Sequence, residues 1–483
     1  MKPKLLCLLA LLLAVAGCSR PAAISVTEQV INPGYLGNGV EWDPYDEAAS
    51  WGAEVSESDW QKLFTRMDFA RPGFVRCMIS SPYRYFDNGT YDRERNSESL
   101  LKLLEYCQQR DIDVLFGEFN PPRWSMKGDQ AWVRMSVDYL AWLVLEKGLT
   151  CIKHFIIFNE PDGYWASPNG DYDFWRSMME RFREEMKTHP GLAEKVSMAG
   201  PDVVVDYRNP ASAYDAPGWV SRTASDLDEM TGLYEVHAYP GQYQVRSGAF
   251  ARQLQEFKWP EGKKMVLGEA GYKYWRPEDA DLQAECDRRA AEHPFTKGTD
   301  SQMMCGDYFY GLDLPLLSMT IMNGGLSGMA VWMLDDAMHS CGDSGNTSDI
   351  KLWGFWNILG EEVFGDPSLE NPKPAFYSWS LMCRFFPRGC DILRVDAPDL
   401  NGLCTVAAAK DGGHSFAAVN YSDEPLTLEV KLDLSDGVRY EYVQGVCPED
   451  DDHLPVPVQT GLTGGRHRVQ LPAQSFVLLS DIK

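Results

Sequence analysis

Eight short apolar runs, each followed by a longer amphipathic segment, fill most of the chain between residues 35 and 386. Short apolar runs that alternate with helical patterns are typical of βα units in a parallel sheet. We therefore expect eight parallel strands in this part of the chain. The expected strand ranges are 35–40, 74–79, 113–116, 154–158, 195–199, 232–236, 264–268 and 328–333.

The amphipathic segments between these runs predict the helices. Their expected ranges are 57–68, 98–110, 131–146, 172–188, 250–257, 307–322 and 371–386. Eight parallel strands with intervening helices predict an α/β fold, a (β/α)8 TIM barrel, over residues 36–386. A doubly wound sheet is the alternative, but it rarely needs eight such units, and the chain carries no glycine-rich dinucleotide fingerprint.

From residue 387 onward the pattern changes to short β-rich runs separated by turn residues. These runs are 403–409, 415–420, 426–434, 439–443 and 466–471. They predict a small C-terminal antiparallel β-sandwich domain over residues 387–483. Because residues 23–31 also have a strand pattern, we expect residues 18–35 to form a linker and a strand that joins an edge of this β-domain.

The first seventeen residues have the pattern of a targeting segment. Lys2 and Lys4 precede an apolar stretch that is too short for a membrane-spanning helix. The next residues, Val-Ala-Gly-Cys, match a bacterial lipobox that ends at Cys18. We expect residues 1–17 to be a lipoprotein signal peptide, Cys18 to be lipidated, and the protein to be exported and membrane-anchored, in the periplasm or at the cell surface. The alternative is an ordinary signal peptide with an incidental cysteine.

The balance of charges argues against one class of partner. The chain has 45 Lys and Arg against 70 Asp and Glu, a formal net charge of −25. Nucleic-acid binding needs clustered Lys and Arg, so we expect no nucleic-acid partner. The twelve cysteines include no Cys-x-x-Cys pair, so we expect no zinc site or other metal. Nothing in the sequence implies a cofactor.

The strongest functional signal lies at the end of the fourth expected strand, where the apolar run ends in Asn159-Glu160-Pro161. Pro161 cannot donate a strand hydrogen bond, so the strand should stop there and leave Glu160 at the C-terminal rim of the barrel. A carboxyl just beyond an apolar strand is partly desolvated, which favours the protonated form that a general acid needs. The alternative is an ordinary turn, since all three residue types are common in turns.

The second signal lies at the end of the seventh expected strand, where Gly268-Glu269-Ala270-Gly271 follows an apolar run. The fourth and seventh strands face each other across the mouth of an eight-stranded barrel. Two carboxyls in these positions suit glycoside hydrolysis, which needs an acid on the leaving oxygen and a second group on the opposite face of the sugar. A gap of about 5 Å between them would let the second carboxyl attack carbon directly, with retention of configuration.

This combination resembles clan A of the glycoside hydrolases, which has a (β/α)8 barrel, an Asn-Glu acid/base on strand four and a nucleophilic Glu on strand seven. The resemblance covers roughly residues 36–385. It implies that Asn159 contacts the 2-hydroxyl of the substrate, that Glu160 is the acid/base and that Glu269 is the nucleophile.

The resemblance also assigns roles to four other residues. His237 and Tyr239 match the aromatic pair on strand six, and Tyr239 would hold the nucleophile by a hydrogen bond. Arg76 ends the second strand, where many clan members place an arginine near the nucleophile. Trp332 on the eighth strand matches the platform beneath the sugar in subsite −1. A structural histidine and a core tryptophan are the alternatives.

The stretch after the third strand points to a narrower likeness. Residues 120–127, Asn-Pro-Pro-Arg-Trp-Ser-Met-Lys, are similar to a Pro-Pro-x-Trp-Met-Lys stretch in family 30, although Ser125 is inserted. The early strand and the C-terminal β-domain fit family 30 and its relative family 39. We therefore expect Trp124 to bind substrate, and Glu118 to bind sugar hydroxyls from the same rim.

The leading hypothesis is a retaining β-glycosidase that acts on an oligo- or polysaccharide outside the cytoplasm. The chemistry would use Glu269 as nucleophile and Glu160 as acid and then base. The alternative is a non-catalytic glycan-binding surface lipoprotein on a degenerate barrel. Such a protein would keep the aromatic platforms but would not need both glutamates.

Overall fold

The computed structural model describes residues 21–46, 48, 52–296, 299–339 and 349–483. The expected signal peptide over residues 1–17 and the expected lipidation site at Cys18 lie outside the described residues. Lipid anchoring therefore stays a prediction. Within the described ranges, no helix is both long and apolar enough to cross a membrane.

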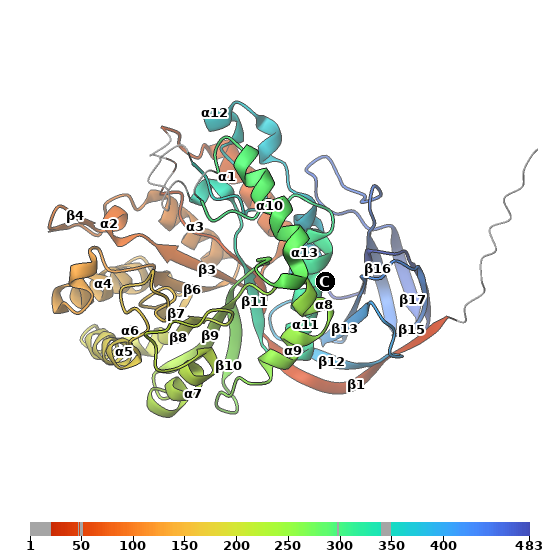
Figure 1. Ribbon diagram of the computed structural model, residues 1–483, viewed down its shortest axis with the longest axis horizontal. Helices are drawn as coiled ribbons and strands as arrows, with labels where there is room; N and C mark the ends of the chain where they lie inside the picture. The colour runs from red at the N-terminus through yellow and green to blue at the C-terminus, as the bar shows by residue number, and fades with distance from the viewer. Residues whose placement is uncertain (1–20, 47, 49–51, 297–298, 340–348) are drawn as a thin grey trace, which may run out of the picture.

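Eight parallel strands close into a barrel, which forms the left-hand part of the molecule in Figure 1. Each predicted run contributes one strand, and the strands follow one another around the barrel in chain order. The strands are β2 (Gly37–Glu41), β3 (Phe74–Ile79), β6 (Asp113–Glu118), β7 (Ile152–Ile156), β8 (Ser197–Val204), β9 (Thr231–Ala238), β10 (Lys264–Ala270) and β11 (Gly328–Val331). The prediction of a TIM barrel with a C-terminal β-domain is confirmed.

Seven predicted helices are present around the barrel. They are α1 (Glu57–Ala70), α3 (Glu98–Gln109), α4 (Gln130–Ala141), α5 (Tyr172–Met186), α9 (Ala249–Leu254), α11 (Tyr310–Asn323) and α13 (Pro374–Phe385). The helices that were not predicted include α7 (Ala216–Asp226), α8 (Gln242–Arg246) and α10 (Ala280–Glu292). In α7 the first turn contains Pro217 and Gly218, which obscure the helical pattern although proline is favourable there.

Short elements decorate the loops of the barrel. They are α2 (Ser81–Arg84), α6 (Leu192–Lys195), α12 (Gly360–Phe364) and the hairpin of β4 (Phe86–Asp87) and β5 (Thr90–Tyr91).

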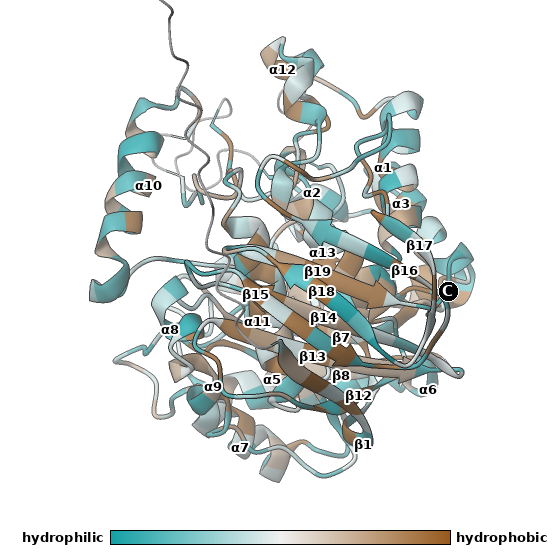
Figure 2. Cartoon of the chain, turned by 90° about the vertical axis from the view of Figure 1, so that its right-hand side faces the viewer, coloured by the Kyte–Doolittle hydropathy of each residue, from teal (hydrophilic) through white to brown (hydrophobic). Residues whose placement is uncertain are grey.

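The remaining strands form one nine-stranded sheet beside the barrel, in the order β17-β16-β19-β14-β13-β12-β1-β15-β18. Their bounds are β1 (Ala22–Tyr35), β12 (Cys390–Asp396), β13 (Leu403–Lys410), β14 (Gly413–Asn420), β15 (Leu426–Lys431), β16 (Leu434–Tyr442), β17 (Gln459–Gly464), β18 (His467–Leu471) and β19 (Ser475–Ser480). The central strands β13, β14 and β19 are strongly hydrophobic (Figure 2).

The N-terminal strand β1 lies inside this sheet, so the expectation of an edge strand was wrong. β1 is long enough to pair twice: residues 22–25 run parallel to β15, and the strand runs antiparallel to β12 up to Tyr35. The sheet is therefore mixed rather than purely antiparallel. Ile24 of β1 packs in the core of this domain with Phe416, Leu428 and Val430.

Two helices and a pair of tyrosines join the barrel to the β-domain. Helices α11 and α13 lie between the two parts (Figure 1). Tyr308 and Tyr442 stack with ring centroids 4.6 Å apart, and each hydroxyl donates a hydrogen bond to the backbone carbonyl of the other residue.

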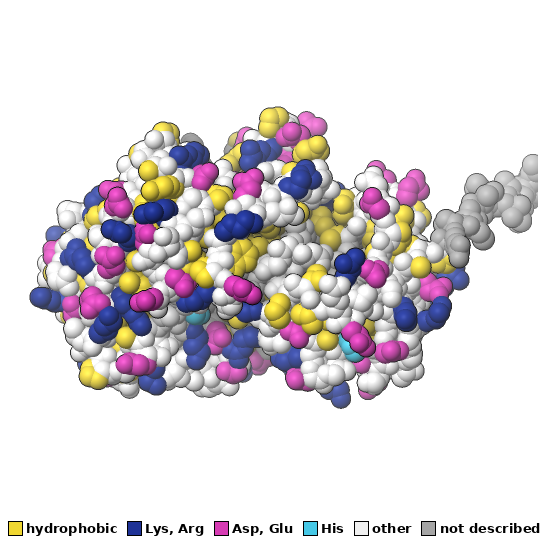
Figure 3. All heavy atoms as spheres, turned by 90° about the horizontal axis from the view of Figure 1, so that it is seen from below, with side chains coloured by type: hydrophobic (Ala, Val, Ile, Leu, Met, Phe, Trp, Pro, Cys, Tyr) yellow, Lys and Arg dark blue, Asp and Glu magenta, His cyan; other side chains and the backbone are white. Residues whose placement is uncertain are grey.

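On the face drawn in Figure 3, Lys and Arg side chains are interspersed with Asp and Glu.

We expect Ile24→Ala to lower the free energy of unfolding by about 2–4 kcal/mol, because it removes buried apolar volume from the core of the β-domain. Ile24 is 1% exposed, whereas Val30 on the same strand is 42% exposed. Val30→Ala is the matched control and should stay within about 0.5 kcal/mol of the wild type. Urea unfolding measures both values. Equal effects of the two substitutions would contradict the interior position of β1.

Candidate active site

The interior of the barrel divides into an apolar lower part and an ionisable upper part. The lower part contains buried apolar side chains from most strands: Phe74, Leu115, Ile156, Ala199, Leu233, Val266 and Ala330. Above it, toward the C-terminal ends of the strands, lie buried charged groups. Because side chains alternate along a strand, Arg76 and Glu235 point inward like their apolar neighbours two residues away.

Arg76 on β3 holds the upper part together. Its Nη1 donates to Glu41 Oε1 and Oε2 at 2.9 and 2.8 Å and to Glu269 Oε2 at 3.0 Å. Its Nη2 donates to Asn159 Oδ1 at 2.7 Å and Asp202 Oδ2 at 3.1 Å. Burial lowers the pKa of Arg76, but the surrounding carboxylates outweigh that effect and raise the pKa well above its ordinary value. The guanidinium is thus a permanent buried cation.

Glu269 on β10 is aimed at the centre of the barrel mouth. The pairing of β10 with β9 shifts register between Leu267 and Glu269, so the strand bulges at Gly268. A Cβ atom on Gly268 would lie 2.2 Å from Glu235 Oε2, so only glycine fits there. Tyr239 donates its hydroxyl to Glu269 Oε1, and Arg76 donates to Oε2. Both carboxylate oxygens are therefore fixed.

Glu160 lies four residues beyond the end of β7 and faces Glu269. Its φ of 49° lies in the left-handed region, and its backbone N–H donates to Asp202 Oδ1 at 2.8 Å. One carboxylate oxygen is 2.9 Å from His237 Nδ1, and the other accepts from Trp165 Nε1 at 2.5 Å. The side chain is 13% exposed.

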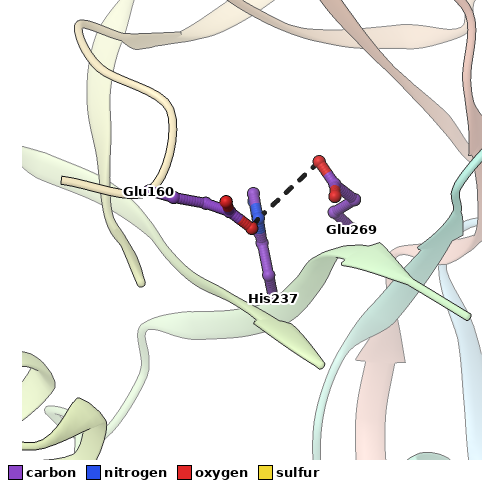
Figure 4. A group of neighbouring side chains, drawn as sticks. All are labelled: Glu160, His237 and Glu269. Atoms are coloured by element: carbon purple, nitrogen blue, oxygen red, sulfur yellow. Dashed lines mark hydrogen bonds and ion pairs between the residues drawn. The ribbon is translucent and has the colours of Figure 1, made fainter. Parts of the chain in front are cut away.

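The two glutamates lie close together. One carboxylate oxygen of Glu160 and one of Glu269 are within 4.8 Å of each other, with His237 Nδ1 between them. Figure 4 shows the two carboxylates facing each other above His237, from the loop after β7 and from β10.

His237 on β9 connects the acid/base candidate to two buried carboxyls. Its Nε2 lies 3.3 Å from Asp202 Oδ1 and 3.6 Å from Glu235 Oε2. Burial lowers the pKa of His237, but the charges of Asp202 and Glu269 outweigh it and raise the pKa well above the ordinary value. Burial raises the pKa of Glu235 well above its ordinary value, and the nearby Asp202 raises it further. The structure thus favours an imidazolium at His237 and a neutral acid at Glu235.

A cavity of about 690 Å³ opens above the two glutamates. Its size is suited to a small organic ligand. Aromatic side chains dominate its walls: Phe119, Tyr164, Trp165, Tyr207, Tyr239, Trp275, Trp332 and Trp353. Asn159, Glu160 and Glu269 also line it. Two tryptophans that follow β11 in the chain differ in position: Trp353 lines the cavity, and Trp356 is fully buried.

Most of the predicted site residues are brought together, but not all as expected. Asn159, Glu160, Tyr239, Glu269 and Trp332 line the cavity. Arg76 and His237 lie beneath it, fully buried, and bind the two glutamates.

Two predicted substrate-binding residues lie elsewhere. Glu118 is 1% exposed and accepts hydrogen bonds from Ser81, Tyr85, Trp132 and Ser136. Its side chain points outward between the barrel and helix α4, because it follows inward-facing Gly117. Trp124 lies in a short 3₁₀ turn, is 53% exposed and is not part of the cavity wall. The expectation for Glu118 is corrected, because its carboxyl is buried away from the cavity. Substrate binding by Trp124 stays a prediction.

Sequence analysis missed Asp202 and the aromatic residues beside Glu160. Asp202 follows Gly200-Pro201, and a proline inside a strand pattern suggested that the strand ended at residue 199, although β8 continues to Val204. An acidic residue within the apolar run of residues 198–205 was the available signal. Tyr164 and Trp165 lie directly after the Asn-Glu-Pro motif, in a loop with no periodic pattern.

Two groups of described residues bring possible metal ligands together: Glu160, His237 and Glu269, and Asp202, Glu235 and His237. A metal ligand must be a neutral histidine, whereas the environment of His237 favours the charged form. Arg76 already pairs with both Glu269 and Asp202. These contacts fit a site in which protein side chains supply the positive charge better than a metal centre.

Comparison with known proteins supports the fold. The sequence matches no protein-family model and no curated protein, but solved structures resemble it. A GH30 endoxylanase from Clostridium papyrosolvens C71 matches with a TM-score of 0.56 at 14% identity, over 95% of this chain and 99% of its own. A glucosidase from Croceicoccus marinus matches with a TM-score of 0.62 at 12% identity, over 96% and 99%. The chain therefore shares the fold of these solved glycoside hydrolases, a (β/α)8 barrel with a β-domain.

A third solved structure shows how widely the fold is shared. It is a family 51 α-L-arabinofuranosidase from Bifidobacterium longum, with a TM-score of 0.60 at 12% identity, over 96% of this chain and 100% of its own. In each case the match spans the barrel and the β-domain together. At these identities the likeness concerns the fold, and the chemistry of this chain is argued from its own residues.

We expect Glu235→Gln to change how stability depends on pH. Unfolded glutamate loses its proton near pH 4.3, whereas buried Glu235 keeps it to a higher pH. The wild type should therefore lose stability, relative to the non-titrating glutamine variant, as pH rises above about 4.3. Urea unfolding between pH 4 and 7 measures the difference. A difference that stays constant, or that moves in favour of the wild type as pH rises, would show that Glu235 is ionised.

Proposed function

We propose that this protein is a retaining glycoside hydrolase that cleaves β-glycosidic bonds in an oligo- or polysaccharide. We further propose that it works outside the cytoplasm, anchored to a membrane through lipidated Cys18. The observation that carries the reaction type is the short distance between Glu160 and Glu269, whose nearest carboxylate oxygens lie within 4.8 Å. Retaining enzymes place their carboxyls about 5–5.5 Å apart, whereas inverting enzymes leave about 6.5–9.5 Å for a water molecule.

The contacts of each glutamate match its proposed role. Glu269 accepts hydrogen bonds from Arg76 and Tyr239, which fix its two oxygens and hold the carboxyl group in place for attack on the anomeric carbon. Glu160 is more exposed and lies at the wall of the cavity, where it can reach the oxygen between two sugars.

Double displacement follows from this arrangement. Glu269 attacks the anomeric carbon while Glu160 gives its proton to the leaving oxygen, which forms a glycosyl-enzyme ester and releases the leaving group. Glu160, now ionised, takes a proton from water as the water attacks the same carbon. The sugar leaves with its original configuration, and Glu269 is released as a carboxylate. No cofactor enters either step.

The remaining groups position substrate. Trp332 presents its ring to the cavity beside Glu269 and can stack against the apolar face of a sugar. Asn159 is held by Arg76 through its side-chain oxygen, which leaves its amide N–H groups to donate to a sugar hydroxyl. A non-catalytic glycan-binding protein would need the stacking surfaces but not a paired acid and nucleophile with this supporting network.

The similar structures support the reaction class but differ in what they act on. They include an endoxylanase, an endo-β1,6-glucanase and an α-L-arabinofuranosidase. One fold therefore serves different sugars and linkages, and the lining of the cavity decides between them. A hydrolysis screen on plant and host glycans, with product sizes measured, identifies the substrate.

We expect Glu269→Ala to lower kcat by roughly 10⁴-fold or more, because the nucleophile has no substitute. Incubation of the wild type with a panel of 2,4-dinitrophenyl 2-deoxy-2-fluoro-β-glycosides (glucose, galactose, mannose and xylose) should add one fluoroglycosyl group to Glu269. Mass spectrometry of peptides measures the attachment. Full activity of Glu269→Ala, or a label on another residue, would overturn the assignment.

The contrasting variant is Glu160→Ala. Its loss of activity should be much smaller on aryl glycosides with good leaving groups, which need no proton to depart. Added azide should restore turnover by attacking the glycosyl-enzyme in place of activated water. Azide should not restore Glu269→Ala in the same way, because that variant forms no glycosyl-enzyme.

A further inference from the structure

Three aromatic side chains form a continuous wall beside the acid/base. Tyr164 and Trp165 lie in the loop after β7, and Tyr207 follows β8. The ring centroids of Trp165 and Tyr207 are 4.6 Å apart, and those of Tyr164 and Trp165 are 5.0 Å apart. All three line the cavity above Glu160 and Glu269. We call these three residues the aromatic wall.

Two rings of the aromatic wall are exposed at the cavity. Tyr164 is 68% exposed and Trp165 is 36% exposed. Exposed apolar surface of this kind, next to polar groups in a concave site, is typical of a binding surface.

Two contacts hold Trp165 in place beside Glu160. A Cβ atom on Gly163 would lie 2.3 Å from the Trp165 ring, so the indole lies directly over the backbone of Gly163. The indole N–H donates to Glu160 Oε2 at 2.5 Å. The ring plane of Trp165 is therefore fixed relative to the carboxyl that would protonate the leaving oxygen.

The position of the aromatic wall beside Glu160 determines which part of a substrate the wall contacts. The acid must lie next to the bond that breaks, on the side of the leaving oxygen. Tyr239 and Arg76 hold the nucleophile on the other side, and Trp353 packs on Tyr239 with ring centroids 5.4 Å apart. The aromatic wall thus faces the departing group rather than the sugar that becomes attached to Glu269.

We propose that Tyr164, Trp165 and Tyr207 form the leaving-group subsite, which binds a pyranose ring by stacking on its apolar face. The proposal rests on the proposed function. It assigns the preferred substrate as a glycan in which another sugar follows the cleaved bond. It also assigns the same surface to the binding of an acceptor sugar, which can replace water in the second step.

The acceptor step tests this subsite separately from the first step. The wild type is trapped with the 2-fluoro glycoside that labels it, freed of excess reagent and incubated with increasing phenyl β-D-glucopyranoside or cellobiose. Attack of an acceptor hydroxyl on the anomeric carbon releases Glu269 and forms a new glycosidic bond, while Glu160 takes the hydroxyl proton. We expect recovery of activity to accelerate and to saturate with acceptor concentration.

Variants of the wall should weaken acceptor binding. Tyr207→Ala and Trp165→Ala should raise the acceptor concentration at half-maximal rate about 10-fold or more, as loss of a stacking platform does. Trp165→Phe keeps a ring but loses the N–H to Glu160, so its half-maximal concentration should stay within about threefold of the wild type. The matched control is Tyr243→Ala, since Tyr243 is 51% exposed and lies outside the cavity wall. It should match the wild type.

The possible outcomes separate the two proposals. If no glycoside labels the wild type, the proposed function fails and the subsite fails with it. If labelling occurs but neither acceptor accelerates recovery, or if the alanine variants saturate at the wild-type concentration, the subsite assignment alone is overturned. Thermal unfolding of each variant confirms that the fold is retained.

Discussion

The buried guanidinium of Arg76 is the interaction on which the rest of the site depends. A charge inside a barrel is strongly unfavourable unless it is paired, and both terminal nitrogens of Arg76 form ion pairs, with Glu41, Asp202 and Glu269. These contacts fix the nucleophile candidate directly. They fix the acid/base candidate through Asp202, which accepts the backbone N–H of Glu160. Removing the cation would leave several carboxylates together in a dry interior, where they would repel one another.

On strands such as β9 and β10, the inward-facing side chains change from apolar to charged toward the C-terminal end of the strand. Apolar side chains fill the lower barrel and give the rigid support that precise placement of charges requires. The bulge at Gly268 then turns Glu269 into the mouth, and the absence of a side chain at Gly268 makes room for Glu235. Fold stability and site geometry thus rest on the same strands.

The architecture could be predicted from the sequence because parallel strands buried on both faces consist of apolar runs, and all eight runs were recognisable. The sequence was also sufficient to single out Glu160 and Glu269, since each follows a strong strand. It could not show that Glu118 points outward, because a terminal residue of an apolar strand gives no sign of its direction. Nor could it show that β1 lies inside the sheet, since its neighbours are more than three hundred residues away in sequence. The role of Asp202 was hidden by the proline before it.

The central proposal is that Glu160 and Glu269, whose nearest carboxylate oxygens lie within 4.8 Å, act together as acid/base and nucleophile, so that configuration is retained. Proton NMR of the first sugar released from an aryl β-glycoside, recorded before mutarotation, tests this claim directly. The account predicts that the β-anomer accumulates first and the α-anomer follows slowly. Initial release of the α-anomer would contradict it.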